Sequence, residues 1–419
     1  MSRLALARLQ PHGRPDRAGF SLTELLVASG IGLIVMASVA SLFTVFGRAL
    51  TQSQSTVDQV ARLRAAAWKL RQDLAGVTCR VTPWLSPDAE AGYFECVEGP
   101  RKDNAAPHGS SNLEADTDDI LMFTTRAPAG KFFGRYADAN RTIESPYAEV
   151  AWFCRPAPTQ PVVGTRLYNL HRRQLLVIGY AGTTEFTGNG IGGALPTSLP
   201  PASPPPAPLV QTIYWSYDIS LRSESGRLVP NTLGELTKRE NRFMHLPPFP
   251  HNIQTDPAPL DSQRLQRAAT FEGTPREGED LVLTNVISFD MRVFDVEARA
   301  QVSGTITRYP GDPGYGTGSG AFGAYVDLGA GQGGRLARPM EAKSGLPGSR
   351  PTYDTWSEHY EAVRSTTPGG RAGVNSINDC VTSPPYPVPL EGVEVRIRCY
   401  DPTSKQVRQV TVRQSFGSR

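Results

Sequence analysis

The chemically most distinctive residue of the chain is Glu24, the only acidic residue in a stretch that otherwise suits lipid. The stretch is "RAGFSLTELLVASGIGLIVMASVASLFTVFGRAL", residues 17–50, and residues 25–47 carry no charge. A carboxylate costs about 2.5–3.5 kcal/mol at the centre of a membrane helix, and somewhat less near an end. We therefore expect Glu24 to have a partner.

Residues that could catalyse a reaction or bind a metal are scattered through the rest of the chain. There is no G-x-S-x-G, P-loop or H-E-x-x-H motif, and "GYGTGSGAFG" does not join a strand to a helix as a phosphate-binding loop does. The histidines have no metal-ligand spacing; they are His12, His108, His171, His245, His251 and His359. Some aspartates could offer oxygen to Ca²⁺, but a turn or strand edge explains them equally well: Asp116, Asp118 and Asp119, and Asp312 with Asp327. We predict no enzyme activity, no cofactor and no metal.

Charge separates the N-terminus from the rest of the chain. The 419 residues carry 43 lysines and arginines against 40 acidic residues. Four arginines and one aspartate lie in residues 1–19, which leaves 39 basic and 39 acidic residues for the other 400. The body therefore has no basic excess, and nothing indicates a nucleic-acid partner.

Apolar spacing predicts one long N-terminal helix. Residues 25–47 would span about 34 Å as a helix, enough to cross a bilayer, and the arginines before them predict a cytoplasmic N-terminus. Beyond Arg48 a stripe at spacings of 3 and 4 predicts an amphipathic continuation; it comprises Val60, Leu63, Ala67, Leu70 and Leu74. The polar residues on its other faces include Asp58, Lys69 and Asp73. With no proline between Pro15 and Pro83, we expect one helix over about residues 20–74.

Three interpretations of this segment compete. A secretory signal peptide cut after residues 38–40 is disfavoured, because Glu24 is a poor start for a signal core and the helical pattern continues past the cut. A plain signal anchor explains the length and the arginines but not Glu24. The third interpretation supplies the missing partner.

The stretch "GFSLTELLVA", residues 19–28, resembles the type IV prepilin cleavage motif. The resemblance implies that a prepilin peptidase cuts after Gly19 and methylates the new amine of Phe20. Glu24 becomes the fifth mature residue, whose carboxylate in the family meets the amine of a neighbouring subunit. Two charges that are each costly in lipid would neutralise one another when subunits dock. The implied partners are the peptidase, other pilin or pseudopilin subunits and the inner membrane.

The rest of the chain predicts a β-rich head with long loops. Expected strands are 120–125, 148–153, 166–170, 174–178, 211–217 and 281–295, with a C-terminal hairpin of 393–401 and 405–416. In 281–295 the apolar residues Leu281, Leu283, Ile287, Phe289, Met291 and Val293 should share one face. Alternation in 393–401 predicts a strand with one face in water. Pro- and Gly-rich loops are expected at 187–208 and 309–339, with a short strand at 321–328, and a short helix at 352–363.

The five cysteines have no C-x-x-C spacing; they are Cys79, Cys96, Cys154, Cys380 and Cys399. Outside the cytoplasm, one or two disulfides with one cysteine left over are plausible, and buried thiols are the alternative. The sequence does not choose a pairing.

The runs "DTDDILMFTTRA" and "DLVLTNVISFDMRVFD" look like those of large minor pilins of the PilW type and of the J-type minor pseudopilin. The expectation is an α+β, pilin-like protein with a leader (1–19), a transmembrane helix (20–50), its periplasmic amphipathic continuation (51–78) and a head (79–419). It would be a single-pass inner-membrane precursor of a minor subunit that initiates or caps a type IV pilus or type II secretion pseudopilus. The alternative is an envelope-anchored binding protein that does not polymerise.

Overall fold

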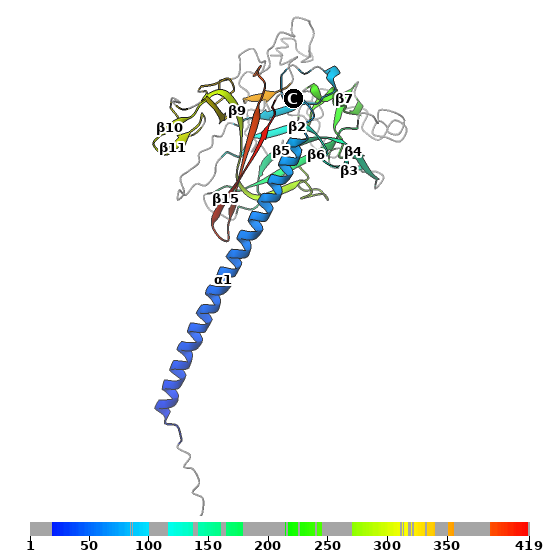
Figure 1. The fold of residues 1–419 in the computed structure, drawn as a ribbon. Coiled ribbons are helices and arrows are strands. Elements are labelled where there is room, and N and C mark those ends of the chain that lie inside the picture. The colour runs from blue at the N-terminus through cyan, green and yellow to red at the C-terminus, as the bar shows by residue number, and fades with distance from the viewer. Residues whose placement is uncertain are drawn as a thin grey trace, which may run out of the picture. The chain divides into compact units, whose positions relative to one another are not determined.

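The computed structural model describes residues 19–83, 85, 87–99, 116–136, 141–160, 165–178, 214, 217–224, 227–238, 241–244, 270–310, 312, 314–316, 320, 322–331, 333–339, 351–355 and 386–417. They form an α+β fold in which one long helix is followed by a large antiparallel sheet, as expected (Figure 1). The chain divides into two compact units, Met1–Thr56 and Val57–Arg419.

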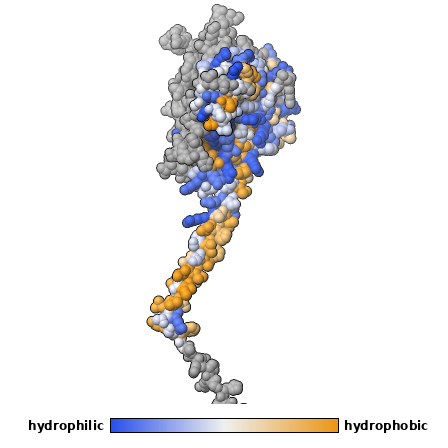
Figure 2. Space-filling view, turned by 60° about the vertical axis from the view of Figure 1, so that its left-hand side comes forward, coloured by the Kyte–Doolittle hydropathy of each residue, from blue (hydrophilic) through white to orange (hydrophobic). Residues whose placement is uncertain are grey.

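Helix α1 runs from Leu22 to Ala75 without a break, which confirms the expected single helix. In the first unit it is long and apolar enough to cross a membrane, and the most apolar window of its surface is not buried at all (Figure 2). Its end is fixed at Gly76, where a Cβ would lie 2.3 Å from the Arg126 carbonyl oxygen. Only glycine permits this close approach to the sheet.

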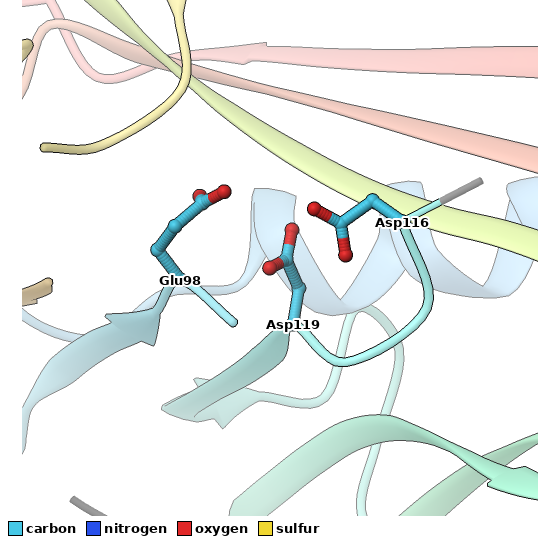
Figure 3. A group of neighbouring side chains, drawn as sticks. All are labelled: Glu98, Asp116 and Asp119. Atoms are coloured by element: carbon cyan, nitrogen blue, oxygen red, sulfur yellow. The ribbon is translucent and has the colours of Figure 1, made fainter. Parts of the chain in front are cut away.

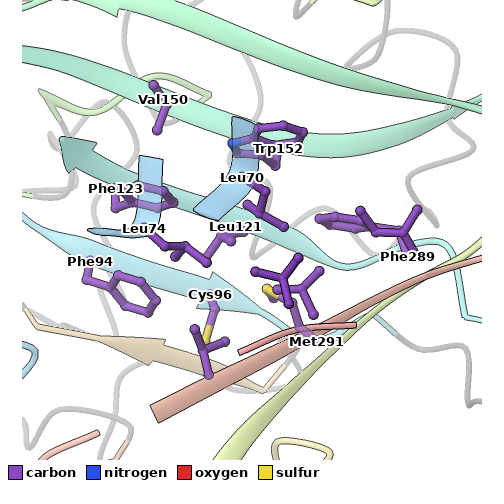
Figure 4. Close-up of a cluster of buried hydrophobic side chains, with 14 of the residues drawn as sticks. Leu70, Leu74, Phe94, Cys96, Leu121, Phe123, Val150, Trp152, Phe289 and Met291 are labelled. Atoms are coloured by element: carbon purple, nitrogen blue, oxygen red, sulfur yellow. The ribbon is translucent and has the colours of Figure 1, made fainter. Parts of the chain in front are cut away.

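In the second unit the last turns of α1 supply part of the main hydrophobic core (Figure 4). The buried positions of the helix are Leu63, Ala66, Ala67, Leu70, Asp73 and Leu74, and Val60 is half-buried. Fully burying one leucine side chain contributes about 1.5–3 kcal/mol, so the predicted stripe holds this end of the helix on the sheet. The prediction placed Asp73 on a polar face, and this was wrong, because its side chain is 2% exposed.

Within the described residues, nine strands form one sheet whose paired neighbours are all antiparallel. Their order is β13-β1-β2-β5-β6-β9-β14-β15, and β12 pairs with β9. The strands are β1 Phe94–Val97, β2 Ile120–Arg126, β5 Tyr147–Pro156, β6 Tyr168–Leu176, β9 Leu281–Arg299, β12 Phe322–Val326, β13 Thr352–Asp354, β14 Gly392–Asp401 and β15 Gln406–Ser415.

Three separate hairpins and two short 3-10 helices complete the described fold. The hairpins pair β3 Phe132–Tyr136 with β4 Arg141–Ser145, β7 Leu221–Glu224 with β8 Arg227–Pro230, and β10 Gln301–Ser303 with β11 Ile306–Arg308. The 3-10 helices are η1 Pro87–Ala89 and η4 Glu235–Thr237.

Most of the expected strands are present, with some differences. The strands expected at 120–125, 148–153 and 281–295, and the C-terminal hairpin, correspond to β2, β5, β9 and β14–β15. The separate strands expected at 166–170 and 174–178 were wrong, because β6 is one continuous strand that pairs with β5 along its whole length. The expected strand 321–328 is β12. The loop at 187–208 and most of the expected strand 211–217 lie outside the described residues.

Both faces of the central sheet are covered. Along β2, Leu121 and Phe123 join the core that contains the helix, while Ile120 and Met122 join a second cluster with Leu236 of η4. Successive strand residues point to opposite faces, so the continuous run "ILMF" is apolar because each face is buried.

The solvent-exposed face expected for β14 is only partly present. Arg396 and Arg398 are half-buried, but Glu394 is fully buried and Tyr400 is 7% exposed. Glu394 is covered because Arg396 and Arg413 from this hairpin both pair with its carboxylate. These ion pairs therefore bury part of the β14 face that the alternation alone predicts to be solvent-exposed.

The single apolar face expected for β9 was also wrong. Ser288 pairs with Arg398 and Val286 with Cys399, which leaves Ile287 as an extra residue in a β-bulge. Ile287 therefore belongs to a different hydrophobic cluster from Phe289.

Two other expectations are corrected in part. The segment expected as a helix at 352–363 begins with strand β13, and residues 356–363 lie outside the described residues. The four described cysteines are buried free thiols, so no disulfide joins them, and Cys380 lies outside the described residues.

Candidate functional site

The N-terminal motif lies at the start of helix α1. Gly19, Phe20 and Ser21 precede α1, which begins at Leu22. The Phe20 side chain is 86% exposed, and apart from the residues next to Gly19 in the chain, no atom of the described residues lies within 4 Å of the position a Gly19 Cβ would take. The bond between Gly19 and Phe20 thus lies outside the helix, between two exposed residues.

Ser21 and Glu24 form a reciprocal capping box at the start of the helix. The Ser21 backbone N–H and hydroxyl both donate to Oε2 of Glu24, at 3.0 and 3.1 Å, and the Glu24 backbone N–H donates to the Ser21 Oγ at 3.2 Å. This arrangement satisfies backbone donors that the first turn of a helix leaves free. The sequence signal for this box is S-x-x-E, which is present as "SLTE" at residues 21–24 but was not among the predictions.

The capping box changes the expectation that Glu24 needs a partner from outside its own chain. Its carboxylate already has a local partner in Ser21. Both bonds go to Oε2, however, and within the described residues Oε1 accepts none. An ionised carboxylate has about four acceptor positions. Glu24 can therefore cap the helix and still receive a cationic amine.

The apolar part of α1, between Leu22 and Thr51, exposes apolar side chains, and several of its hydroxyl groups form hydrogen bonds with the helix backbone. Ser29, Ser38, Thr44 and Thr51 each donate their hydroxyl to a backbone carbonyl three or four residues earlier, at 2.7–3.0 Å. In lipid, this satisfies polar groups that have no water to bond. Leucine, isoleucine, valine and phenylalanine side chains between Leu22 and Leu50 are largely exposed (Figure 2). The surface fits a bilayer or the side of a similar helix.

The comparisons with known proteins agree with this geometry at the N-terminus. Residues 14–40 match the family model described as the prokaryotic N-terminal methylation motif. No curated protein and no solved structure matches the chain. The matched residues include Gly19, Phe20, Glu24 and part of the apolar run. It supports a pilin-like precursor with a membrane-anchoring N-terminal helix, and it is typical of structural subunits.

The head brings together some of the aspartates that the sequence singled out. Asp312 and Asp327 both pair with the buried Arg292, at 2.7 and 3.0 Å, so they form an ion-pair cluster. Asp116 and Asp119 lie beside Glu98, which the sequence did not indicate (Figure 3). Of the six histidines only His171 is described, and its Nδ1 lies 3.3 Å from Asp280.

Proposed function

We propose that the chain is the precursor of a minor pilin or pseudopilin. Residues 1–19 are the leader, 20–50 the transmembrane part of the helix, 51–78 its periplasmic continuation and 79–419 the head. A prepilin peptidase cuts after Gly19 and methylates Phe20. The mature protein then leaves the inner membrane and joins other subunits in a type IV pilus or a type II secretion pseudopilus.

The observation that carries this proposal is the continuity of α1. One helix of 54 residues starts two residues after Phe20, exposes an apolar surface first and ends buried in a β-rich unit. A cleaved signal peptide has no use for a helix that continues into the folded head. A filament subunit needs it, because the same apolar surface serves as membrane anchor before assembly and as filament core afterwards.

Glu24 has two roles in this proposal. In the precursor it caps the helix through Ser21. In the filament its carboxylate pairs with the amine of Phe20 of a neighbouring subunit, and the two charges neutralise each other in an apolar core. The large head with long loops favours an initiating or capping position, because a bulky head packs poorly in a regular shaft.

A second candidate is an envelope-anchored protein that never polymerises. The capping box favours it, since Ser21 accounts for the carboxylate without any other subunit. The two candidates differ in whether the charge of Glu24 has a use beyond the cap.

Glu24→Gln separates the two roles. Glutamine keeps the side-chain oxygen that a capping box requires, but it removes the charge that an amine would neutralise. Ser21→Ala is the matched control, because it removes the cap and keeps the carboxylate. Each full-length variant is expressed with the other pilin subunits, and insertion, cleavage and recovery of partner subunits in a pull-down are measured.

The filament proposal predicts that Glu24→Gln inserts and is cleaved as the wild type is, but recovers partner subunits at least tenfold less well. Ser21→Ala should assemble nearly normally. If Glu24→Gln assembles as well as the wild type, Glu24 does not pair with an amine. Equal losses in both variants would assign the effect to the cap and would also contradict the pairing.

A further inference from the structure

Three acidic side chains converge at one end of the strand pair β1–β2. Glu98 directly follows β1 and Asp119 directly precedes β2, and the two strands are joined by the pair Val97–Ile120. Each of Glu98, Asp116 and Asp119 offers an oxygen, and these atoms all lie within 4.8 Å of one another. Figure 3 shows the carboxylates of Glu98 and Asp116 directed toward that of Asp119.

Glu98 points to a ligand independently of the aspartates. It follows β1, whereas the aspartates precede β2, and it is 8% exposed. Among the residues that the structure describes, no donor forms a hydrogen bond or ion pair with its carboxylate. Burying a carboxylate without a partner costs several kcal/mol. A buried glutamate aimed at two buried aspartates therefore needs either a proton or a cation that the described residues do not supply.

The surrounding backbone orients the site. Asp119 accepts hydrogen bonds from the Gly99 N–H at 2.9 Å and from the Met291 N–H of β9 at 2.7 Å. The backbone at Gly99 passes so close to Asp118 that a Cβ would lie 2.0 Å from its Oδ1. A larger residue at position 99 would therefore displace Asp118, and Asp119 is held in place by two amides, one from the segment after β1 and one from β9.

The charges near the cluster are mostly negative. Burial and the neighbouring Asp119, Asp327, Asp116 and Asp290 raise the pKa of Glu98 well above its ordinary value. Burial and nearby aspartates likewise raise the pKa values of Asp116 and Asp119. The buried cation Arg292 already pairs with Asp290, Asp312 and Asp327.

We propose that Glu98, Asp116 and Asp119 bind a Ca²⁺ ion. Carboxylate oxygens are the ligands that hard cations prefer, and the three residues of the group offer only oxygen. Ca²⁺ binds oxygens at about 2.3–2.6 Å, so two of its ligands are at most about 5 Å apart, and one oxygen from each of the three residues lies within 4.8 Å of the others. Three carboxylates supply up to six oxygens. Because Asp119 is also bonded to β9, the ion would join β1, β2 and β9, and it would stabilise the head irrespective of filament assembly.

The test uses the full chain in detergent micelles, treated with EDTA and dialysed. Thermal unfolding is followed with and without CaCl₂, and calorimetric titration gives the stoichiometry. We expect one Ca²⁺ per chain and a rise in Tm of about 3–6 °C at saturation. Glu98→Gln and Asp116→Asn should each lose this rise, whereas the exposed control Glu391→Gln should keep it.

Two isosteric variants keep the test informative if one of them folds poorly. An unchanged Tm of the wild type in CaCl₂, with no heat of binding, would overturn the proposal and leave a carboxyl cluster neutralised by protons. If CaCl₂ still raises the Tm of both variants, the ion binds at another site and the proposed site is wrong. An equal rise with MgCl₂ at the same concentration would overturn the assignment to Ca²⁺. All three outcomes are independent of cleavage and assembly, so they leave the proposed function untouched.

Discussion

Replacing Asp73 should weaken the attachment of helix α1 to the sheet and lower the free energy of unfolding. Asp73 lies on α1 and is 2% exposed; it accepts two hydrogen bonds from Arg172, at 2.6 and 2.9 Å, and one from the Trp152 Nε1–H at 3.0 Å. Asp73→Ala leaves a buried guanidinium and a buried indole N–H without this acceptor. Breaking a buried ion pair from one side costs about 3–5 kcal/mol. Domains of ordinary stability have about 5–15 kcal/mol in total, so the loss should be large.

The free energy of unfolding is measured by urea titration of the full chain in micelles, with tryptophan fluorescence as the signal. Asp73→Asn keeps one acceptor oxygen and removes the charge, so it should lie between Asp73→Ala and the wild type. Asp58→Ala, on an exposed face of the same helix, is the control and should change stability by about 0.5 kcal/mol or less. If Asp73→Ala is no less stable than Asp58→Ala, the ion pair does not anchor the helix.

Two further predictions concern buried titratable groups. The raised pKa of Glu98 means that the folded chain keeps a proton that the unfolded chain releases. In calcium-free buffer its contribution to stability is therefore complete below the ordinary value of 4.5 and is lost as pH rises. Glu98→Gln should accordingly gain stability relative to the wild type with rising pH in urea titrations; a constant difference would contradict the shift. Burial raises the pKa of Cys79 to about 12 and that of Cys399 to about 11, so peptide mapping should find both alkylated by iodoacetamide at neutral pH only after denaturation. Rapid labelling of the folded chain would contradict their burial.

Local periodicity carried most of the fold prediction. The helix, β2 and the C-terminal hairpin could be predicted because apolar residues recur at spacings that a single element imposes. The bulge at Ile287 could not, because it depends on the register against β14, which lies about a hundred residues later in the chain. The two strand segments that merge into β6 were separated for the same reason, since pairing with β5 holds the polar residues between them in strand geometry.

The charged residues were the hardest to place. Asp73 follows a polar pattern in the sequence, and only the fold brings Arg172 next to it, 99 positions away. Glu98 lies next to the aspartates before β2 because β1 pairs with β2. The residues around Glu98 and those around the aspartates do not indicate this pairing. The Ser21–Glu24 capping box, in contrast, could have been predicted from the sequence, because it depends only on the local S-x-x-E spacing.

The most direct test of the account is the mass of the mature N-terminus. The full chain is expressed in a host with a prepilin peptidase, and its N-terminal peptide is analysed by mass spectrometry. Gly19→Leu is the matched control, because among the described residues only its chain neighbours lie near the position a Cβ would take, so a loss of cleavage reports recognition by the peptidase. The account predicts a wild-type chain that begins with N-methylated Phe20 and an uncut variant. A wild-type chain that begins at Ser41, or that retains residues 1–19, would contradict it.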